Sequence, residues 1–267
     1  GDAEAAALEL VAHLRARPRP HMGFTREFAE TLRDAATKRQ RQKATEEVDA
    51  ALGKELLQGH GNAIWRAGAE NLLLAATPET CERIAGRALE CRDIWAEGMW
   101  GNTGGVCHLL RVLWPLEEFE NRHAVPLLAW MLTQSEPEWE WARTWDERML
   151  GSSGHNWWLH TFLGFWMAGT FFPEFRGLAQ FQALAGDFLE RELRVLMAPD
   201  GFTRERAGYQ WGTVENFITW AHLAALNGRI FAPEFEALLR ETAATSWKLL
   251  TPDGDVPRMG DAGGRHS

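Results

Sequence analysis

The stretch Gly154-His155-Asn156-Trp157-Trp158-Leu159-His160 opens a long apolar run that ends at the corner Phe171-Phe172-Pro173-Glu174-Phe175. Wound as a helix, the run is apolar on nearly every face, and such a helix is buried in a helical assembly or in a membrane. It holds only about a dozen apolar positions and begins with polar residues, which makes it too short and too polar for a bilayer span. The stretch therefore predicts a buried inner helix over residues 153–169 with polar groups at its first turn.

The second half of the chain contains an internal repeat. The corner recurs as Phe231-Ala232-Pro233-Glu234-Phe235, and the turn Pro199-Asp200-Gly201 recurs as Pro252-Asp253-Gly254. Each unit is an inner apolar helix, a corner, an amphipathic outer helix and a turn. Helical hairpins repeated at this spacing form a stacked array or a closed ring. Because the inner helices are more apolar than the outer ones, the pattern favours a ring, so we predict an all-α fold, a toroid of helical hairpins over residues 1–250.

Strand patterns are nearly absent from the first half, where helical periodicity alternates with Gly and Pro. A glycine-rich loop is expected over residues 98–105. The helices expected there cover residues 3–17, 25–52, 77–97, 106–119 and 123–134.

The composition limits the kinds of partner. The chain has 267 residues, 45% of them hydrophobic, with 28 Lys and Arg against 37 Asp and Glu for a net charge of −9. This balance does not suggest a nucleic-acid partner, and a polyanion would need a local basic patch. Fourteen Trp beside one Tyr indicate mainly helix packing, although exposed indole rings also bind sugars. No segment resembles a membrane anchor.

Three cysteines, Cys81, Cys91 and Cys107, form no pair at metal-ligand spacing, so buried free thiols are expected, with no metal and no cofactor. The chain contains no signal peptide, and its residues alone do not predict a compartment or an oligomeric state.

The candidate site lies at the starts of the two inner helices. His155 and Asn156 begin one, and Tyr209 begins the next at the repeat-equivalent position, so both starts should face the same mouth. Arg204 and Arg206 precede Tyr209 and would bring positive charge to it. A lone His or Tyr more often caps or packs a helix, but the equivalent placement favours chemistry at a proton next to a carboxylate. Substrate contacts are expected from the arginines and from three more residues, Trp157, His160 and Trp211.

Several of these motifs together resemble the heparinase II/III-like polysaccharide lyases, of the alginate lyase and heparinase III type. They are Gly154 to Trp158, the Phe-Phe-Pro-Glu-Phe corner, Gly208-Tyr209, the tail from Pro252 to Asp261, and the opening residues 19–34. The resemblance implies an incomplete (α/α) toroid followed by a β-sandwich domain, with residues 251–267 as the start of a linker. It further implies a secreted or periplasmic enzyme that cleaves an acidic polysaccharide or oligosaccharide, such as alginate or a glycosaminoglycan, by β-elimination.

The resemblance also implies roles for individual residues. Asn156, or His155 beside it, would neutralise the uronate carboxylate, and Tyr209 would protonate the leaving oxygen and in some members also take the C5 proton. The sequence departs from the family at Gln210, where many members have His, which leaves the base open. A further catalytic His would come from the sandwich domain, beyond Ser267.

Two other functions stay open at this point. A helical-toroid glycoside hydrolase would need two carboxylates flanking the cleaved bond, for which Asp200, Glu205 and Glu215 are the candidates. Glu205 lies between two arginines, which suits an ion pair better than a proton-donating acid. A toroid that binds a glycan in a Trp-rich cleft without chemistry is the third alternative.

Overall fold

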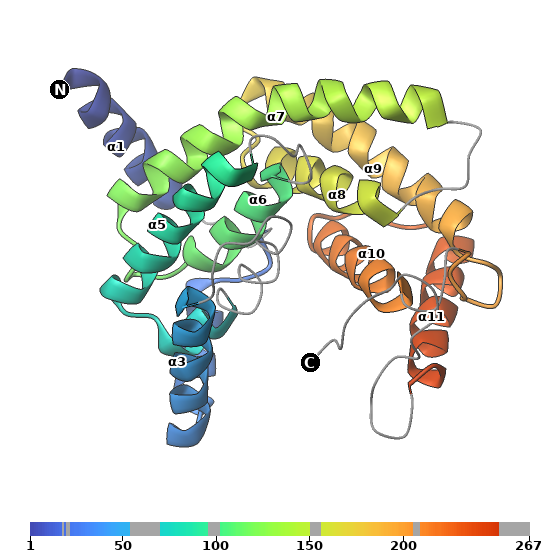
Figure 1. Ribbon diagram of the computed structural model, residues 1–267, viewed down its shortest axis with the longest axis horizontal. Coiled ribbons are helices and arrows are strands. Elements are labelled where there is room, and N and C mark those ends of the chain that lie inside the picture. The colour runs from blue at the N-terminus through green and yellow to red at the C-terminus, as the bar shows by residue number, and fades with distance from the viewer. Residues whose placement is uncertain are drawn as a thin grey trace. The chain divides into compact units, whose positions relative to one another are not determined.

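The computed structural model describes residues 1–17, 19, 22–53, 70–95, 102–149, 156–204 and 209–250. Within these ranges the chain is helical (Figure 1), and the sole extended pairing is an isolated antiparallel bridge between Met197 and Thr203. The predicted all-α fold class is confirmed. None of the helices in these ranges is long and apolar enough to cross a membrane. The expected linker, residues 251–267, lies outside the described residues.

The chain divides into two compact units. Unit 1 comprises residues 1–138 with 170–172, and unit 2 comprises residues 139–169 with 173–267. The helices that lie in unit 1 are α1 (Asp2–Arg15), α2 (Arg26–Ala35), α3 (Lys38–Gly53), α5 (Pro78–Trp95), α6 (Asn102–Leu113) and the first part of α7 (Asn121–Met149). Helix α5 contacts both α3 and α6. Fully buried Val48, Ala88 and Leu109 belong to the core between them.

The helix predicted over residues 25–52 is two helices. Its start is confirmed, since Thr25 Oγ1 accepts the N–H of Phe28 at 3.1 Å as an N-cap. The chain then leaves the helix at Ala36, whose backbone is extended, and Thr37 Oγ1 accepts the N–H of Gln40 at 3.2 Å to start α3. The prediction of one helix was wrong because Thr37 acts as a second cap inside a continuous helical pattern.

Helix α6 begins at Asn102, inside the predicted glycine-rich loop, so that boundary was also wrong. The carboxylate of Glu138, on α7, accepts the backbone N–H of Thr103 at 2.9 Å. Both residues are buried, and the bond satisfies one of the amide groups left free at a helix start. A cap supplied from 35 residues away leaves no local signal in the sequence.

Helix α7 continues 15 residues beyond the predicted end at residue 134, although Pro126 and Pro137 lie inside it. Proline in a helix interior costs about 3 kcal/mol because it removes a hydrogen bond and crowds the preceding turn. Here the helix continues into buried packing. Trp139 lies 4.8 Å from Phe181 and 5.0 Å from Phe165, measured between ring centroids.

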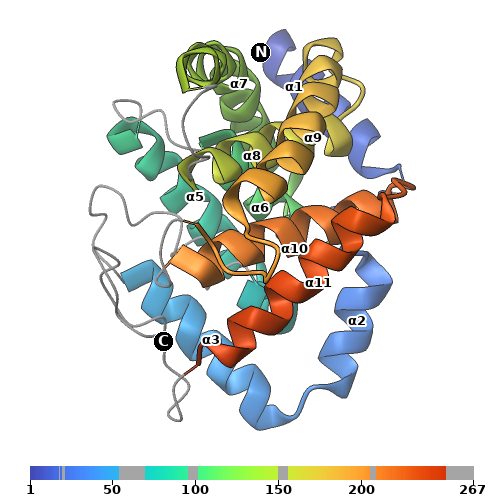
Figure 2. The ribbon, with the colours of Figure 1, turned by 90° about the vertical axis from the view of Figure 1, so that its right-hand side faces the viewer.

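Unit 2 contains the two predicted hairpins, α8 (Asn156–Phe171) with α9 (Arg176–Leu196), and α10 (Gln210–Leu226) with α11 (Pro233–Lys248). Figures 1 and 2 both show α10 and α11 side by side. All side chains from Thr161 to Phe171 are buried, which confirms the buried inner helix. At the first corner the backbones approach closely, since a Cβ on Gly169 would lie 2.3 Å from the carbonyl oxygen of Leu178.

The thiol prediction is confirmed for two of the three cysteines. Cys81 and Cys107 are buried and free, and the Cys81 thiol has its pKa raised to about 12, chiefly by burial. The side chain of Cys91 lies outside the described residues.

Candidate functional site

The start of α10 is fixed by Gln210, the residue that follows Tyr209. Its side chain is fully buried and accepts the backbone N–H of Thr203 at 2.7 Å. The same amide donates to the carbonyl of Gly201 at 2.8 Å and to Ser246 Oγ at 3.1 Å. One side chain thus joins the turn before α10, the first turn of α10 and the last turn of α11.

This network gives a physical reason for glutamine at a position where histidine was expected from the resemblance. A primary amide offers two N–H donors and an acceptor oxygen, whereas a neutral imidazole offers one donor and one acceptor. Three buried partners therefore suit Gln210 better than a histidine. With its amide committed to these bonds, Gln210 positions the turn before α10 and the start of α10.

The turn over residues 199–203 is built for close approach. Gly201 has φ +77°, and a Cβ there would lie 2.4 Å from the carbonyl oxygen of Glu241 on α11. Asp200 Oδ1 accepts the N–H of Phe202 at 3.1 Å, and the Asp200 carbonyl accepts the hydroxyl of Thr245 at 2.6 Å. The turn therefore lies directly against α11.

Two predicted site residues follow from this turn. The N–H of Arg204 bonds to the carbonyl of Leu196 at 2.7 Å, which ends the turn, and its side chain is exposed. Tyr209, the N-cap residue of α10, is half-buried. Both residues thus lie at the end of the α10–α11 hairpin where α10 begins.

The same end carries an aromatic pair. Trp211, a predicted substrate contact, is half-buried and meets Trp247 edge to face, with ring centroids 5.4 Å apart and an interplanar angle of 88°. Trp247 lies in the last turn of α11 and is 68% exposed. Sequence reasoning missed Trp247 as a candidate. The signal was available, because the last turn of an outer helix lies beside the first turn of its inner partner in an antiparallel hairpin.

The remaining predicted residues belong to the α8 side. Asn156 begins α8, but its side chain, that of Trp157, and residues 150–155 and 205–208 lie outside the described residues. His155 and Arg206 are among these. His160 is half-buried in the second turn of α8. A shared cleft for His155, Asn156 and Tyr209 therefore stays a prediction.

The carboxylates that a hydrolase would need are not seen to flank a cavity in the described residues. Asp200 is committed to its own turn, Glu205 is not described, and Glu215 is exposed on α10. No pair of acidic side chains flanks a cavity among the described residues of this hairpin end. Nothing in the part of the chain that the structure describes favours hydrolysis.

Comparison with known proteins agrees with the resemblance seen in the sequence. Residues 148–267 match the family described as the heparinase II/III N-terminus. The predicted resemblance is confirmed. The matched segment of this chain contains every residue that the sequence analysis predicted for the site, from His155 to Trp211. No curated protein sequence matches the chain.

Two solved structures, both of a heparinase III and one of them with methylated lysines, are similar over nearly the whole chain. The TM-scores are 0.54 and 0.53 at 15% identity, with 95% and 96% of this chain covered. At this identity the likeness shows the fold alone. The chain spans 46% and 47% of the two heparinase III chains, somewhat under half their length.

Proposed function

We propose that this protein is a polysaccharide lyase that cleaves a uronic-acid-containing polysaccharide by β-elimination. The observation that carries the proposal is the match of residues 148–267 to the heparinase II/III N-terminus, since it contains both inner-helix starts. Alginate and glycosaminoglycans are the substrate classes. A secreted or periplasmic location, where such polymers are met, is part of the proposal.

In the proposed reaction, Asn156 or His155 hydrogen-bonds the uronate carboxylate and stabilises the charge that develops as the C5 proton leaves. The C4–O bond then breaks, a C4–C5 double bond forms, and the leaving oxygen takes a proton from Tyr209. Tyr209 or a histidine from elsewhere removes the C5 proton. The unsaturated sugar that remains absorbs ultraviolet light.

The described end of the α10–α11 hairpin supports these roles in three ways. Tyr209 is half-buried rather than sealed in the core, as suits a side chain that contacts a substrate. Arg204 supplies a cation within five residues of it. The edge-to-face pair of Trp211 and Trp247 presents an indole surface of the kind on which sugar rings stack.

The test is a screen of acidic polysaccharides, alginate and heparan sulfate among them, for new ultraviolet absorbance during digestion. The expected result is an absorbance rise with at least one uronate polymer and none with neutral dextran. Reducing ends that appear without absorbance would indicate hydrolysis instead. Binding without either product would leave the chain a carbohydrate-binding domain.

A further inference from the structure

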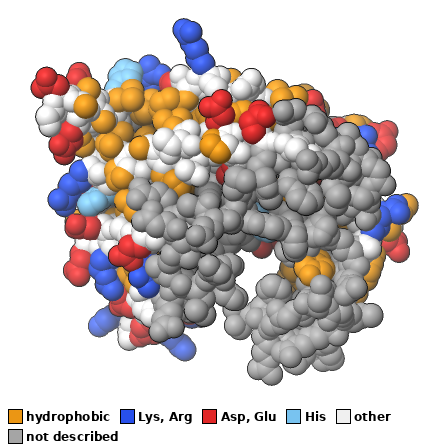
Figure 3. Space-filling view, turned by 45° about the horizontal axis from the view of Figure 1, so that its top comes forward, with side chains coloured by type: hydrophobic (Ala, Val, Ile, Leu, Met, Phe, Trp, Pro, Cys, Tyr) orange, Lys and Arg blue, Asp and Glu red, His pale blue; other side chains and the backbone are white. Residues whose placement is uncertain are grey.

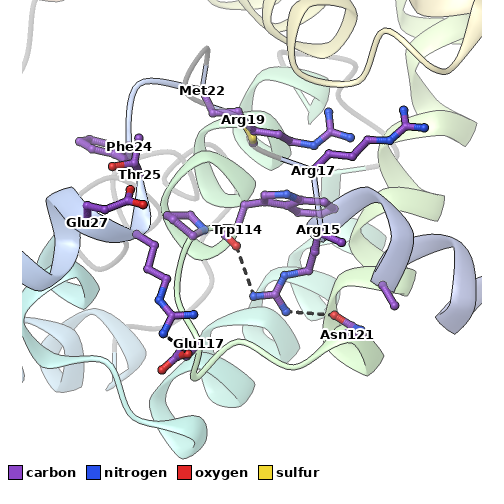
Figure 4. A pocket seen from close by; sticks show the side chains of 14 residues that line it. Arg15, Arg17, Arg19, Met22, Phe24, Thr25, Glu27, Trp114, Glu117 and Asn121 are labelled. Carbon is purple, nitrogen blue, oxygen red and sulfur yellow. Dashed lines mark hydrogen bonds and ion pairs between the residues drawn. The ribbon is translucent and has the colours of Figure 1, made fainter.

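A cavity of about 650 Å³ lies in unit 1, between α1, the start of α2 and the segment after α6. None of its lining residues is among those proposed for catalysis. Four arginines and two glutamates line it: Arg15, Arg17, Arg19, Arg26, Glu27 and Glu117 (Figure 4). A cavity of this size holds one or two sugar rings.

Among the described residues, the Arg15 guanidinium has no carboxylate partner. All four of its hydrogen bonds go to neutral acceptors, namely the carbonyls of Trp114, Leu116 and Phe119 and the side-chain oxygen of Asn121. Burial lowers the pKa of Arg15, which reflects the cost of keeping this charge away from water. An anion in the cavity would reduce that cost.

Arg19, which is buried, lies near the half-buried Arg15. Arg19 is 8% exposed and donates to the carbonyls of Leu14 and Phe171. Its guanidinium carbon lies 5.8 Å from the ring centroid of Trp114, and that of Arg15 lies 6.0 Å from the same centroid. Figure 4 shows the Trp114 ring between them. Two like charges this close to one ring make the electrostatic potential on this side of the cavity positive.

The two acidic side chains of the cavity offset only part of the charge of its four arginines. Glu117 forms an ion pair with Arg26 at the rim. The Glu27 carboxylate bonds to its own backbone N–H and to Thr25, which lowers its pKa and commits it to the start of α2. The cavity thus keeps a positive excess in a chain of net charge −9. Elsewhere, the described surface seen in Figure 3 mixes acidic and basic side chains.

We propose that this cavity is a second, non-catalytic binding site for an acidic sugar unit, a ring that carries a carboxylate or a sulfate. Arg17 at the rim binds the oxyanion, and Arg15 and Arg19 supply the attracting field. The choice of an anion rests on the cavity alone, whereas the choice of a sugar rests on the proposed function. Such a site would hold a second segment of the acidic polymer.

The test is calorimetric titration of the whole chain with trigalacturonate, which carries carboxylates, with a heparin-derived tetrasaccharide, which adds sulfates, and with neutral maltotriose. The variant is Arg17→Glu, at an exposed rim position that leaves the core unchanged. The matched control is Arg39→Glu, the same charge change at an exposed position of α3 outside the cavity. All titrations are repeated in an Arg204→Gln, Trp211→Ala background, which removes the contacts proposed at the α10 end.

Arg17→Glu should weaken binding of at least one acidic probe by about tenfold or more, since a charged hydrogen bond is lost and a repulsion is added. Arg39→Glu should change binding less than about twofold, and maltotriose should not bind. Equal dissociation constants for the two variants, no acidic probe bound, or maltotriose bound equally well would overturn the proposal. Polymer cleavage together with acidic-probe binding that Arg17→Glu leaves unchanged would refute this site and leave the lyase proposal intact. Binding that depends on Arg17, without cleavage of any polymer, would support this site and refute the lyase proposal.

Discussion

Gln210 controls the geometry of the candidate site through three buried hydrogen bonds. Replacement by glutamate keeps the oxygen that accepts from Thr203 but removes both donated bonds and buries a carboxylate. We expect Gln210→Glu to lower the free energy of unfolding by about 2–4 kcal/mol. Urea denaturation at neutral pH measures this change in the free energy of unfolding. Gln180→Glu, at an exposed position of α9, is the control and should change stability by less than about 0.5 kcal/mol; an equal loss in both variants would contradict the network.

The second prediction concerns the stability contributed by Gly201 in the same turn. Alanine there would combine a positive φ with a Cβ 2.4 Å from the Glu241 carbonyl, and the backbone of a helix cannot yield. Gly201→Ala should cost about 3 kcal/mol or more, as strain adds to overpacking. Gly228 has φ +80° and open space around its Cβ position, so Gly228→Ala should cost only about 1–2 kcal/mol. Urea midpoints that fall equally for the two variants would contradict the close approach of Gly201 to the Glu241 carbonyl.

The Cys81 thiol predicts a dependence of stability on pH. Burial, then the nearby Glu118 carboxylate, raises its pKa to about 12, with Arg33 and Arg15 acting in the opposite direction. The folded thiol keeps its proton, whereas the unfolded one loses it near about pH 8.5. This contribution to stability is therefore complete below about pH 8.5 and disappears as the pH rises toward 12, at about 1.4 kcal/mol per pH unit.

Urea denaturation between about pH 8 and pH 10.5 compares the intact chain with Cys81→Ala. The variant should show a shallower fall in stability as the pH rises, although its stability at neutral pH is lower. Val106→Ala removes a buried group that does not titrate and should keep the slope of the intact chain. Identical slopes in all three proteins would mean that Cys81 ionises freely in the folded state.

At the scale of the elements, the hairpins of unit 2 could be predicted and several helices of unit 1 could not. The inner helix around Phe165 is apolar on all faces, and the Pro-Glu-Phe corners recur, so the local pattern sufficed. The start of α6 depends on the distant carboxylate of Glu138, and the length of α7 depends on packing of Trp139. Neither cause is local, and both boundaries were missed. The position of Tyr209 at the start of α10 was predictable from the repeat, whereas the role of Gln210 depends on tertiary contacts of its amide.

The helix α2 offers a test of a local signal. Thr25→Ala removes the side-chain oxygen that accepts the N–H of Phe28, and we expect a loss of about 1 kcal/mol. Thr31→Ala, at an exposed position inside the same helix, should be neutral or slightly stabilising, because alanine favours helix. Thermal or urea unfolding distinguishes them. A Thr25→Ala variant as stable as Thr31→Ala would show that the cap contributes nothing.

At the scale of the whole molecule, an all-α chain at 15% identity retains the fold of about half of a heparinase III. Burial patterns of inner and outer helices specify such a fold without close sequence identity, since core positions accept many apolar side chains if volume and pattern are kept. The proposed function depends on far fewer residues, those expected to act at the starts of α8 and α10. The central claim is therefore that Tyr209 transfers a proton in an elimination reaction.

The most direct test compares Tyr209→Phe with the intact sequence on the best uronate polymer, following the absorbance of the unsaturated product. The comparison is made with this chain and with a form that carries a β-sandwich domain after Ser267, which the resemblance expects to supply a catalytic histidine. The account predicts that Tyr209→Phe lowers kcat by roughly 10² to 10⁴, with circular dichroism and substrate binding nearly unchanged. Near-normal elimination by Tyr209→Phe in the longer form would contradict it and would transfer the proton-carrying role to His155.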